Sequence, residues 1–257
     1  MGTMLLMHGI PGNSCLEELN EKRPGLIREI HRSYAEAGAK VIITNSFGAN
    51  RLRLNSSKKV ERLNRKAVKI ARQAARKVKV FASIGPLGRE ARKLKQTAMI
   101  KAFSEQVKAL EKEKPDGYLI ETMTSLTEAE AAILAVREVS DRYLIVSMTF
   151  PRGLPKKNQR MMDLMSMTLR EAGADCIGAN CGLHPEEVFN FLNIFRMHDP
   201  GPWFAKPASG LPTRPIFPEE FAKWGLRIAN LGVTYIGGCC GTTPVHIRLL
   251  GEKLKKI

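Results

Sequence analysis

The sequence predicts one (β/α)8 barrel domain over residues 1–257, with its first strand truncated or missing. Seven apolar runs alternate with helical patterns at intervals of about 25 to 40 residues, which is typical of repeated βα units. Polar and reactive residues follow the ends of these runs along the whole chain, as they do around the rim of a barrel, whereas an open sheet gathers them at one switch point. No GxGxxG follows the first run, which argues against a dinucleotide-binding sheet.

The elements are justified in chain order by their hydrophobic patterns. Continuous apolar runs, as in buried parallel strands, predict strands at 40–47, 78–86, 117–123, 143–150, 174–181, 203–210 and 233–241. Helical periodicity predicts helices at 26–37, 58–78, 98–113, 126–139, 160–172, 185–197, 218–231 and 244–256. Ser125 with Glu128 indicates a capping box, and Thr243 before Pro244 indicates an N-cap. Residues 1–7 are too short and too close to the terminus for a comfortable first strand.

Composition limits the class of protein. The chain is 44% hydrophobic and 26% charged, which suits one large core. No stretch approaches about 18 apolar residues, and no signal-peptide pattern opens the sequence, so we expect no membrane segment. Five cysteines are an odd and scattered set, which favours a reducing, cytoplasmic location with thiols free for metal binding or catalysis.

The net charge of +16 raises the possibility of a polyanionic partner. Much of this charge follows helical spacing over residues 58–79, and it surrounds apolar positions such as Val60, Leu63 and Ile70. This pattern favours an amphipathic helix with a solvated basic face over a nucleic-acid surface. The sequence contains no zinc-finger spacing or aromatic RNA-binding signature, so we do not expect nucleic acid as a partner.

Three cysteines follow predicted strands. Cys181 ends one run, and Cys239 and Cys240 lie between glycines where the last run passes into a helix. Three thiolates from two strand ends would form a zinc site with one open position, suited to a thiol substrate. A redox-active pair at Cys239 and Cys240 is the alternative. We interpret Cys15 and Cys176 as small apolar side chains.

The same residues carry a family resemblance. The segments 178–181 and 236–244 resemble the cysteine motifs of the homocysteine S-methyltransferase family, and 44–48, 84–86, 120–122 and 148–150 resemble further strand ends of that family. The resemblance implies a (β/α)8 barrel with Cys181, Cys239 and Cys240 as zinc ligands. It also implies that Glu121 holds the amino group of homocysteine. The rest of the expected pocket is Asn45, Ser46, Phe47, Gly48 and Asn180.

Three segments depart from the family pattern. The family's Asp-Gly-Ala-Met-Gly-Thr begins here at Met1-Gly2-Thr3, so the first strand and its aspartate are not in the sequence. The family's Pro-Asn-Ala-Gly is Pro207-Ala-Ser-Gly210, and the stretch 151–158 is short. These departures indicate a truncated gene model or an altered methyl acceptor.

The resemblance implies a zinc-dependent enzyme of methionine biosynthesis that methylates homocysteine. No side chain is expected to be catalytic beyond the metal's activation of the substrate thiol. The donor stays open between a methyl-corrinoid or methyltetrahydrofolate, S-methylmethionine and betaine, because the chain has no cobalamin-binding Asp-x-His-x-x-Gly motif. A separate corrinoid protein is a possible partner. The alternatives are a catalytically degraded zinc barrel and a basic nucleic-acid-binding protein.

Overall fold

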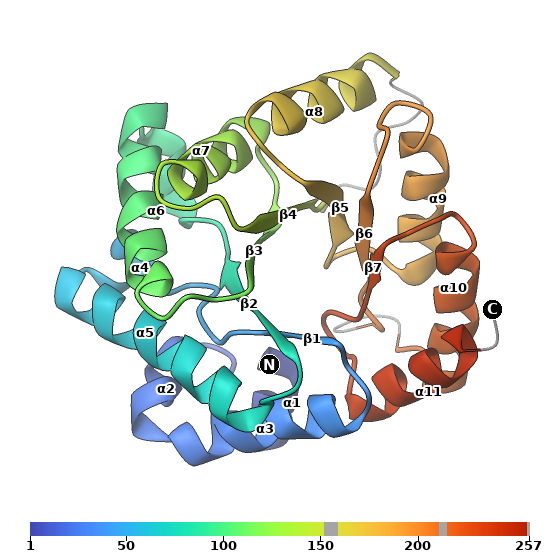
Figure 1. The fold of residues 1–257 in the computed structure, drawn as a ribbon, viewed down its shortest axis with the longest axis horizontal. Helices are drawn as coiled ribbons and strands as arrows, with labels where there is room; N and C mark the ends of the chain where they lie inside the picture. Colours follow the sequence, from blue (N-terminus) through green and yellow to red (C-terminus); the bar gives the residue numbers. More distant parts are fainter. Residues whose placement is uncertain (152–158, 211–214, 256–257) are drawn as a thin grey trace.

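A computed structural model describes residues 1–151, 159–210 and 215–255. Its centre is a curled parallel sheet in which each strand pairs with the next one along the chain, in the order β1 to β7 (Figure 1). The strands are β1 (Val41–Ile43), β2 (Lys79–Ile84), β3 (Gly117–Met123), β4 (Tyr143–Met148), β5 (Cys176–Asn180), β6 (Trp203–Lys206) and β7 (Tyr235–Ile236). All carboxyl ends therefore lie at one face.

Helices form a ring around this sheet (Figure 1). They are α1 (Gly2–Met7), α2 (Leu19–Lys22), α3 (Pro24–Glu36), α4 (Arg51–Leu54), α5 (Ser57–Ala74), α6 (Gln96–Glu111), α7 (Leu126–Arg137), α8 (Gln159–Glu171), α9 (Pro185–Phe195), α10 (Pro218–Ala229) and α11 (Pro244–Leu254), with short 3-10 turns η1 (Leu16–Glu18) and η2 (Arg89–Lys93). Every predicted strand and helix is present, so the predicted α/β barrel class is confirmed.

Several strands are shorter than predicted. The sheet ladder ends at Ile43 in β1 and at Ile236 in β7, and the residues beyond these points are loops. Helix α5 ends at Ala74, before the predicted residue 78, because Val78 and Ala75 form a turn that leads into β2. The predicted end of the last helix at residue 256 and most of the stretch 151–158 lie outside the described residues.

The first strand is the main difference from a closed barrel. Residues 2–7 form helix α1, whose Leu5 packs against Ile27 and Ile30 of α3, and the described residues contain no ladder between β1 and β7. Two hydrogen bonds cross this seam instead. Tyr34 Oη donates to the Thr242 carbonyl over 2.9 Å, and Gly241 N donates to Thr3 Oγ1 over 2.9 Å. The prediction that residues 1–7 do not supply a regular strand is therefore confirmed.

The interior of the curled sheet has two layers. The lower layer is an apolar cluster of Phe81, Leu119, Ile145, Cys176 and Phe204. Two residues further along four of these strands, towards their carboxyl ends, the same inward face carries Ser83, Glu121, Ser147 and Lys206. All four side chains are buried. The upper layer is therefore polar and lies directly below the loops that hold the cysteines.

The helix starts agree in part with the predicted caps. The Ser125 side chain accepts from Glu128 N, but the Glu128 carboxylate accepts from Leu87 N over 2.8 Å, so the reciprocal half of the predicted box is wrong. At α11, Thr243 N donates to His246 Nδ1 over 3.2 Å, which gives His246 a capping role. Among the described helices, none is long and apolar enough to cross a membrane.

Candidate metal centre

Three cysteine sulfurs meet at the carboxyl ends of β5 and β7. The Sγ atoms of Cys181, Cys239 and Cys240 all lie within 4.8 Å of one another, and Cys181 Sγ and Cys240 Sγ are 3.3 Å apart. Tetrahedral zinc with Zn–S bonds of about 2.3 Å separates its sulfur ligands by roughly 3.8 Å. The donor set and its spacing fit zinc with one coordination position left for another ligand. In the described part of the chain, no other group of His, Cys, Asp and Glu side chains has this ligand geometry.

The backbone of one of these cysteines has an unusual conformation, and hydrogen bonds hold the loops of all three. Cys181 has a φ of 37°, in the left-handed region that disfavours side chains, and the Thr149 hydroxyl donates to its carbonyl. Cys239 N donates to the Pro207 carbonyl over 2.8 Å, and Ser209 N donates to the Cys240 carbonyl over 2.8 Å. The loop after β7 is thus fastened to the loop after β6. Strained backbone fixed by its surroundings is common at functional sites.

The thiols influence one another strongly. Hydrogen bonds from Cys181 and Cys240, together with the nearby Lys206 ammonium, lower the pKa of Cys239 well below its ordinary value. Hydrogen bonds to Cys239 and Cys240, and then burial, raise the pKa of Cys181. The cluster therefore holds one thiolate readily and resists further ionisation, because like charges would crowd together. A divalent cation removes that repulsion, which is the behaviour expected of a metal site.

A buried ion pair lies next to the cysteines. Lys206 Nζ contacts Glu121 Oε2, and Ser83 Oγ donates to Glu121 Oε1 over 2.6 Å. Burial by itself lowers the pKa of Lys206, but the Glu121 carboxylate raises it above its ordinary value. Lys206 therefore stays charged. Helix α1 also brings the α-amino group of Met1 near this pair, and burial lowers the pKa of that amine.

Asn180 joins three strand ends. Its Oδ1 accepts from Thr122 N over 2.9 Å, and its Nδ2 donates to Thr122 Oγ1 over 2.8 Å. The same Nδ2 lies 3.9 Å from Cys239 Sγ. Thr122 has a φ of 63°, so these bonds hold the residue after Glu121 in a left-handed conformation. Asn180 thus connects Thr122, the neighbour of Glu121, to the sulfur cluster.

The segment after β1 is close-packed. Asn45 Nδ2 donates to the Leu16 carbonyl and Asn20 Oδ1, and Ser46 Oγ donates to the Ser83 carbonyl. The Phe47 ring lies against Gly85, whose hydrogen leaves room that a Cβ would fill. Gly48 N donates to the buried Glu17 carboxylate over 2.6 Å. In the described structure, the side-chain donors of Asn45 and Ser46 and the Gly48 amide are thus engaged by the protein itself.

Sequence reasoning missed Lys206, Ser83 and Ser147. A usable signal existed for Lys206, because it is a charged residue at the end of an apolar run, just as Glu121 is. Ser83 and Ser147 are ordinary strand residues in the sequence. Ser83 and Ser147 become candidate site residues only in the fold, because their side chains face the barrel interior one layer above the apolar cluster.

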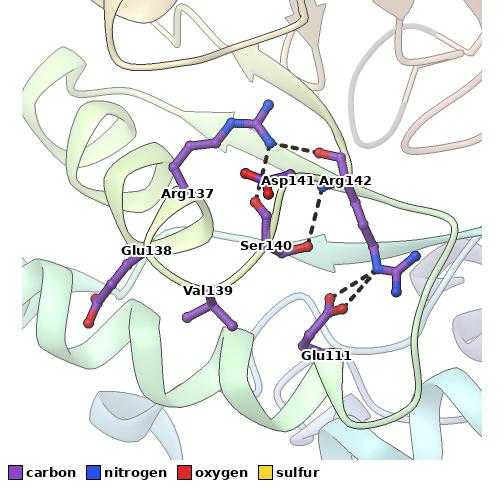
Figure 2. A pocket seen from close by; sticks show the side chains of 7 residues that line it. All are labelled: Glu111, Arg137, Glu138, Val139, Ser140, Asp141 and Arg142. Atoms are coloured by element: carbon purple, nitrogen blue, oxygen red, sulfur yellow. Dashed lines mark hydrogen bonds and ion pairs between the residues drawn. The ribbon is translucent and has the colours of Figure 1, made fainter.

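A hollow lies next to the residues that lead into the amino-terminal end of β4 (Figure 2). It has a volume of about 440 Å³ and is lined by the end of α6 and by residues 137–142, which lead into β4. Arg142 Nε and Glu111 Oε1 form an ion pair at 2.9 Å across one side, and Arg137 donates to the Gly173 carbonyl and Asp175. The charged side chains of Glu111, Arg137, Glu138 and Arg142 already have protein partners, and the cysteines are not among the lining residues.

Comparison with known proteins agrees with this geometry. The model of the family described as homocysteine S-methyltransferase matches residues 1–254. The chain belongs to this family. The predicted resemblance is therefore confirmed, and the protein is a member of a methyltransferase family.

Two of the relatives that match this chain are methionine synthases. Methionine synthase of Mycobacterium tuberculosis is 33% identical over 95% of this chain, and methionine synthase of Mycobacterium leprae is 32% identical over 91%. In both cases the match covers 22% of the relative, so the chain spans about a fifth of their length.

Among solved structures, the homocysteine methyltransferase MmuM from Escherichia coli has the same fold. Its metallated form aligns with a TM-score of 0.82 at 24% identity, covering 98% of this chain and 93% of MmuM. Its apo form aligns with a TM-score of 0.79 over the same shares of the two chains. The family member described here thus shares most of the MmuM fold.

Proposed function

We propose that residues 1–257 form one zinc-dependent homocysteine S-methyltransferase domain, which converts homocysteine to methionine in the cytoplasm. The observation that carries this proposal is the cluster of Cys181, Cys239 and Cys240 sulfurs beside the buried Glu121 carboxylate. Three soft thiolate ligands favour zinc and leave one position for a substrate sulfur. Membership of the homocysteine S-methyltransferase family supports the same substrate.

The chain's own residues hold and orient the reactants. Bound zinc would supply a Lewis acid that favours the thiolate form of the substrate sulfur, since a free alkyl thiol has a pKa near 8.5. Glu121 accepts the substrate's ammonium through a charge-assisted hydrogen bond. Asn180 contacts both Thr122 and Cys239 and would orient them. We assign residues 45–48 to the β1 side of the substrate pocket. After the substrate thiol has lost its proton to solvent, its sulfur forms a bond to the donor's methyl carbon while the bond from that carbon to the donor breaks, and the demethylated donor leaves with the bonding electrons.

The donor is delivered by another protein or domain, and we infer a methyl-corrinoid. The methionine synthase relatives carry the matched region in 22% of their length, which leaves most of each relative for other functions. Methyl transfer from a methyl-corrinoid should therefore exceed transfer from S-methylmethionine and betaine when the three donors are compared at equal concentration. A larger rate with either small donor would replace this assignment.

The variant Cys239→Ala tests the metal assignment. We expect it to lose both stoichiometric zinc and homocysteine methylation, because two thiolates no longer hold the ion tightly. Metal analysis after dialysis and a methionine assay measure the two losses. The matched control is Cys15→Ser, which removes an exposed thiol away from the cluster and should retain both. One equivalent of zinc or undiminished activity in Cys239→Ala would contradict the three-thiolate site.

X-ray absorption at the zinc edge separates an enzyme from an inert zinc barrel. Adding homocysteine to the zinc-loaded protein should change the ligand set from three sulfurs to four. An unchanged spectrum at saturating homocysteine would mean that the metal is structural only.

A further inference from the structure

The buried Glu121–Lys206 pair is complementary in charge to the headgroup of an amino acid. Glu121 is negative and can face an ammonium, and Lys206 is positive and can face a carboxylate. We propose that this pair selects zwitterionic thiols: Glu121 binds the substrate ammonium, Lys206 changes partner to bind the α-carboxylate, and Ser147 completes the hydrogen bonding of the headgroup. The inference rests on the proposed function and names Lys206 and Ser147 as specificity-determining residues of that site.

Charge balance is the first argument. Glu121 and Lys206 are both buried, and each is the other's ion-pair partner. A buried charge that loses its partner is strongly disfavoured, so a ligand that opens the pair must supply both signs. A bound zwitterion supplies both signs. Its ammonium replaces the Lys206 ammonium as the partner of Glu121, and its carboxylate forms an ion pair with Lys206. A thiol with only an ammonium would leave Lys206 unpaired.

Location is the second argument. Lys206 pairs with Asn180 in the sheet register, and Cys181 N lies 3.4 Å from the Lys206 carbonyl. Lys206 is therefore the strand neighbour of the residues at the sulfur cluster. Homocysteine has two methylene groups between its α-carbon and its sulfur. This short spacer suits a headgroup at Glu121 and Lys206 and a sulfur at the cysteine cluster.

The segment after β1 supports Lys206 as the carboxylate partner. The Gly48 amide, which could otherwise bind a substrate carboxylate, donates to Glu17 Oε1 over 2.6 Å. Glu17 is in the 3-10 turn η1 and is itself buried, so its carboxylate is a fixed partner of the Gly48 amide. A substrate carboxylate therefore needs another donor, and Lys206 is a buried lysine at the same end of the barrel.

Ser147 supplies an independent observation. Its side chain is fully buried, and its Oγ forms no hydrogen bond within the described residues. It shares the inward face of β4 with Ile145, which lies in the apolar cluster below. Burying an unpaired hydroxyl is unfavourable for folding. A hydrogen bond to the bound headgroup gives this hydroxyl a partner in the same layer as Glu121 and Lys206.

Calorimetric titration of the zinc-loaded full chain tests the proposal with three thiols. L-homocysteine carries both charged groups, 3-mercaptopropylamine lacks the carboxylate, and 4-mercaptobutanoate lacks the ammonium. The wild-type protein should bind homocysteine at least about tenfold more tightly than either analogue. In Lys206→Met, the affinity for homocysteine should fall by about tenfold or more, to the affinity for 3-mercaptopropylamine. Lys223→Met removes an exposed lysine of α10 and should leave all three affinities unchanged.

Two further variants separate a loss of binding from a loss of folding. Lys206→Met leaves Glu121 buried without its cation, so the double variant Glu121→Gln/Lys206→Met restores neutrality. It should fold by circular dichroism and bind the three thiols with no preference among them. Ser147→Ala should keep or raise the melting temperature, because it removes a buried hydroxyl without a partner, and it should weaken homocysteine binding by about fivefold, because one hydrogen bond to the headgroup is lost.

The outcomes distinguish this inference from the proposed function. If the zinc-loaded wild-type protein binds none of the thiols, the proposed function fails. If homocysteine binds but the double variant or Ser147→Ala keeps wild-type affinity and ranking, the assigned roles are wrong. If 4-mercaptobutanoate binds more tightly than homocysteine, Lys206 stays paired with Glu121 and the acceptor is a thiol acid, which also overturns the inference.

Discussion

Asn180 shows how a single side chain can couple the two halves of the site. Its amide contacts Thr122 through both of its polar atoms and reaches towards Cys239. Asn180 is fully buried, so these partners have little access to water as a replacement. A strand-end asparagine could equally have formed only a local turn. Its contacts with Thr122 and Cys239 support our proposal that Asn180 orients Cys239 as a metal ligand.

The variant Asn180→Ala should weaken both stability and metal binding. The Thr122 amide would lose its acceptor, and an unsatisfied buried donor costs about 1–3 kcal/mol. Urea denaturation measures the first effect, and competition with a zinc chelator measures the second, for which tenfold weaker binding is typical when such an orienting contact is lost. The exposed Asn230→Ala is the control. Equal zinc affinity in the two variants would limit Asn180 to a packing role.

At the scale of elements, β5 and β6 approach each other unusually closely. A Cβ placed on Gly178 would lie 1.7 Å from the Phe204 carbonyl oxygen. That contact involves backbone, so no side-chain movement can relieve it. The close approach matters because Cys181 follows β5 and Lys206 ends β6. Gly178 therefore permits the close approach of the two strands that lead to Cys181 and Lys206.

We expect Gly178→Ala to destabilise the protein by more than about 3 kcal/mol, because the β5–β6 ladder must separate. Urea denaturation gives the free energy of unfolding. Gly251→Ala in α11 is a matched control, since a Cβ there meets no atom within 4 Å, and it should be neutral or stabilising by up to about 1 kcal/mol. Similar effects of the two substitutions would show that the strands can move apart at little cost.

Helix α5 accounts for much of the positive charge without a polyanionic ligand. Arg62 pairs with Glu21 at 2.7 Å, Arg65 pairs with Glu113 at 2.7 Å, and Lys59 pairs with Glu18 at 2.9 Å. These pairs connect α5 to residues near α2 and α6. Each exposed pair adds little stability. The predicted basic helix is therefore present, and a substantial part of its basic face is directed to acidic residues of the same protein.

At the scale of the whole molecule, the curled sheet has a seam between β1 and β7. Side chains rather than a strand ladder connect its two sides, and Tyr34 is the clearest example because its hydroxyl binds the Thr242 carbonyl. Burial raises the pKa of Tyr34 to about 12, so the hydroxyl stays a donor at neutral pH. The loop that carries Cys239 and Cys240 lies on one side of this seam. Its rigidity thus depends on contacts with α1 and α3.

Tyr34→Phe should cost about 1 kcal/mol of stability and speed amide hydrogen exchange in residues 239–243, because the loop loses one anchor. Exchange measured by mass spectrometry resolves this segment. Tyr235→Phe alters a ring in the apolar cluster at the other end of the barrel and should leave that exchange unchanged. An unaltered rate in Tyr34→Phe would mean that other contacts alone hold the seam.

The sequence by itself determined the βα alternation, the location of Cys181, Cys239 and Cys240 at strand ends, and the lack of a strand at residues 1–7. These features depend on local periodicity and residue type, which neighbouring positions are sufficient to define. Glu121 was also found this way, as a charge at the end of an apolar run, although its role stays a proposal.

Only the tertiary structure decided which of these residues meet. The Glu121–Lys206 pair joins β3 to β6, Asn180 joins β5 to β3 and β7, and the unpaired Ser147 hydroxyl faces the same interior. Such contacts depend on strand register and on the curvature of the sheet, which bring together residues as many as 85 positions apart. The local sequence of one strand does not determine which residues of other strands lie opposite it. The partner of each polar side chain therefore follows from the fold.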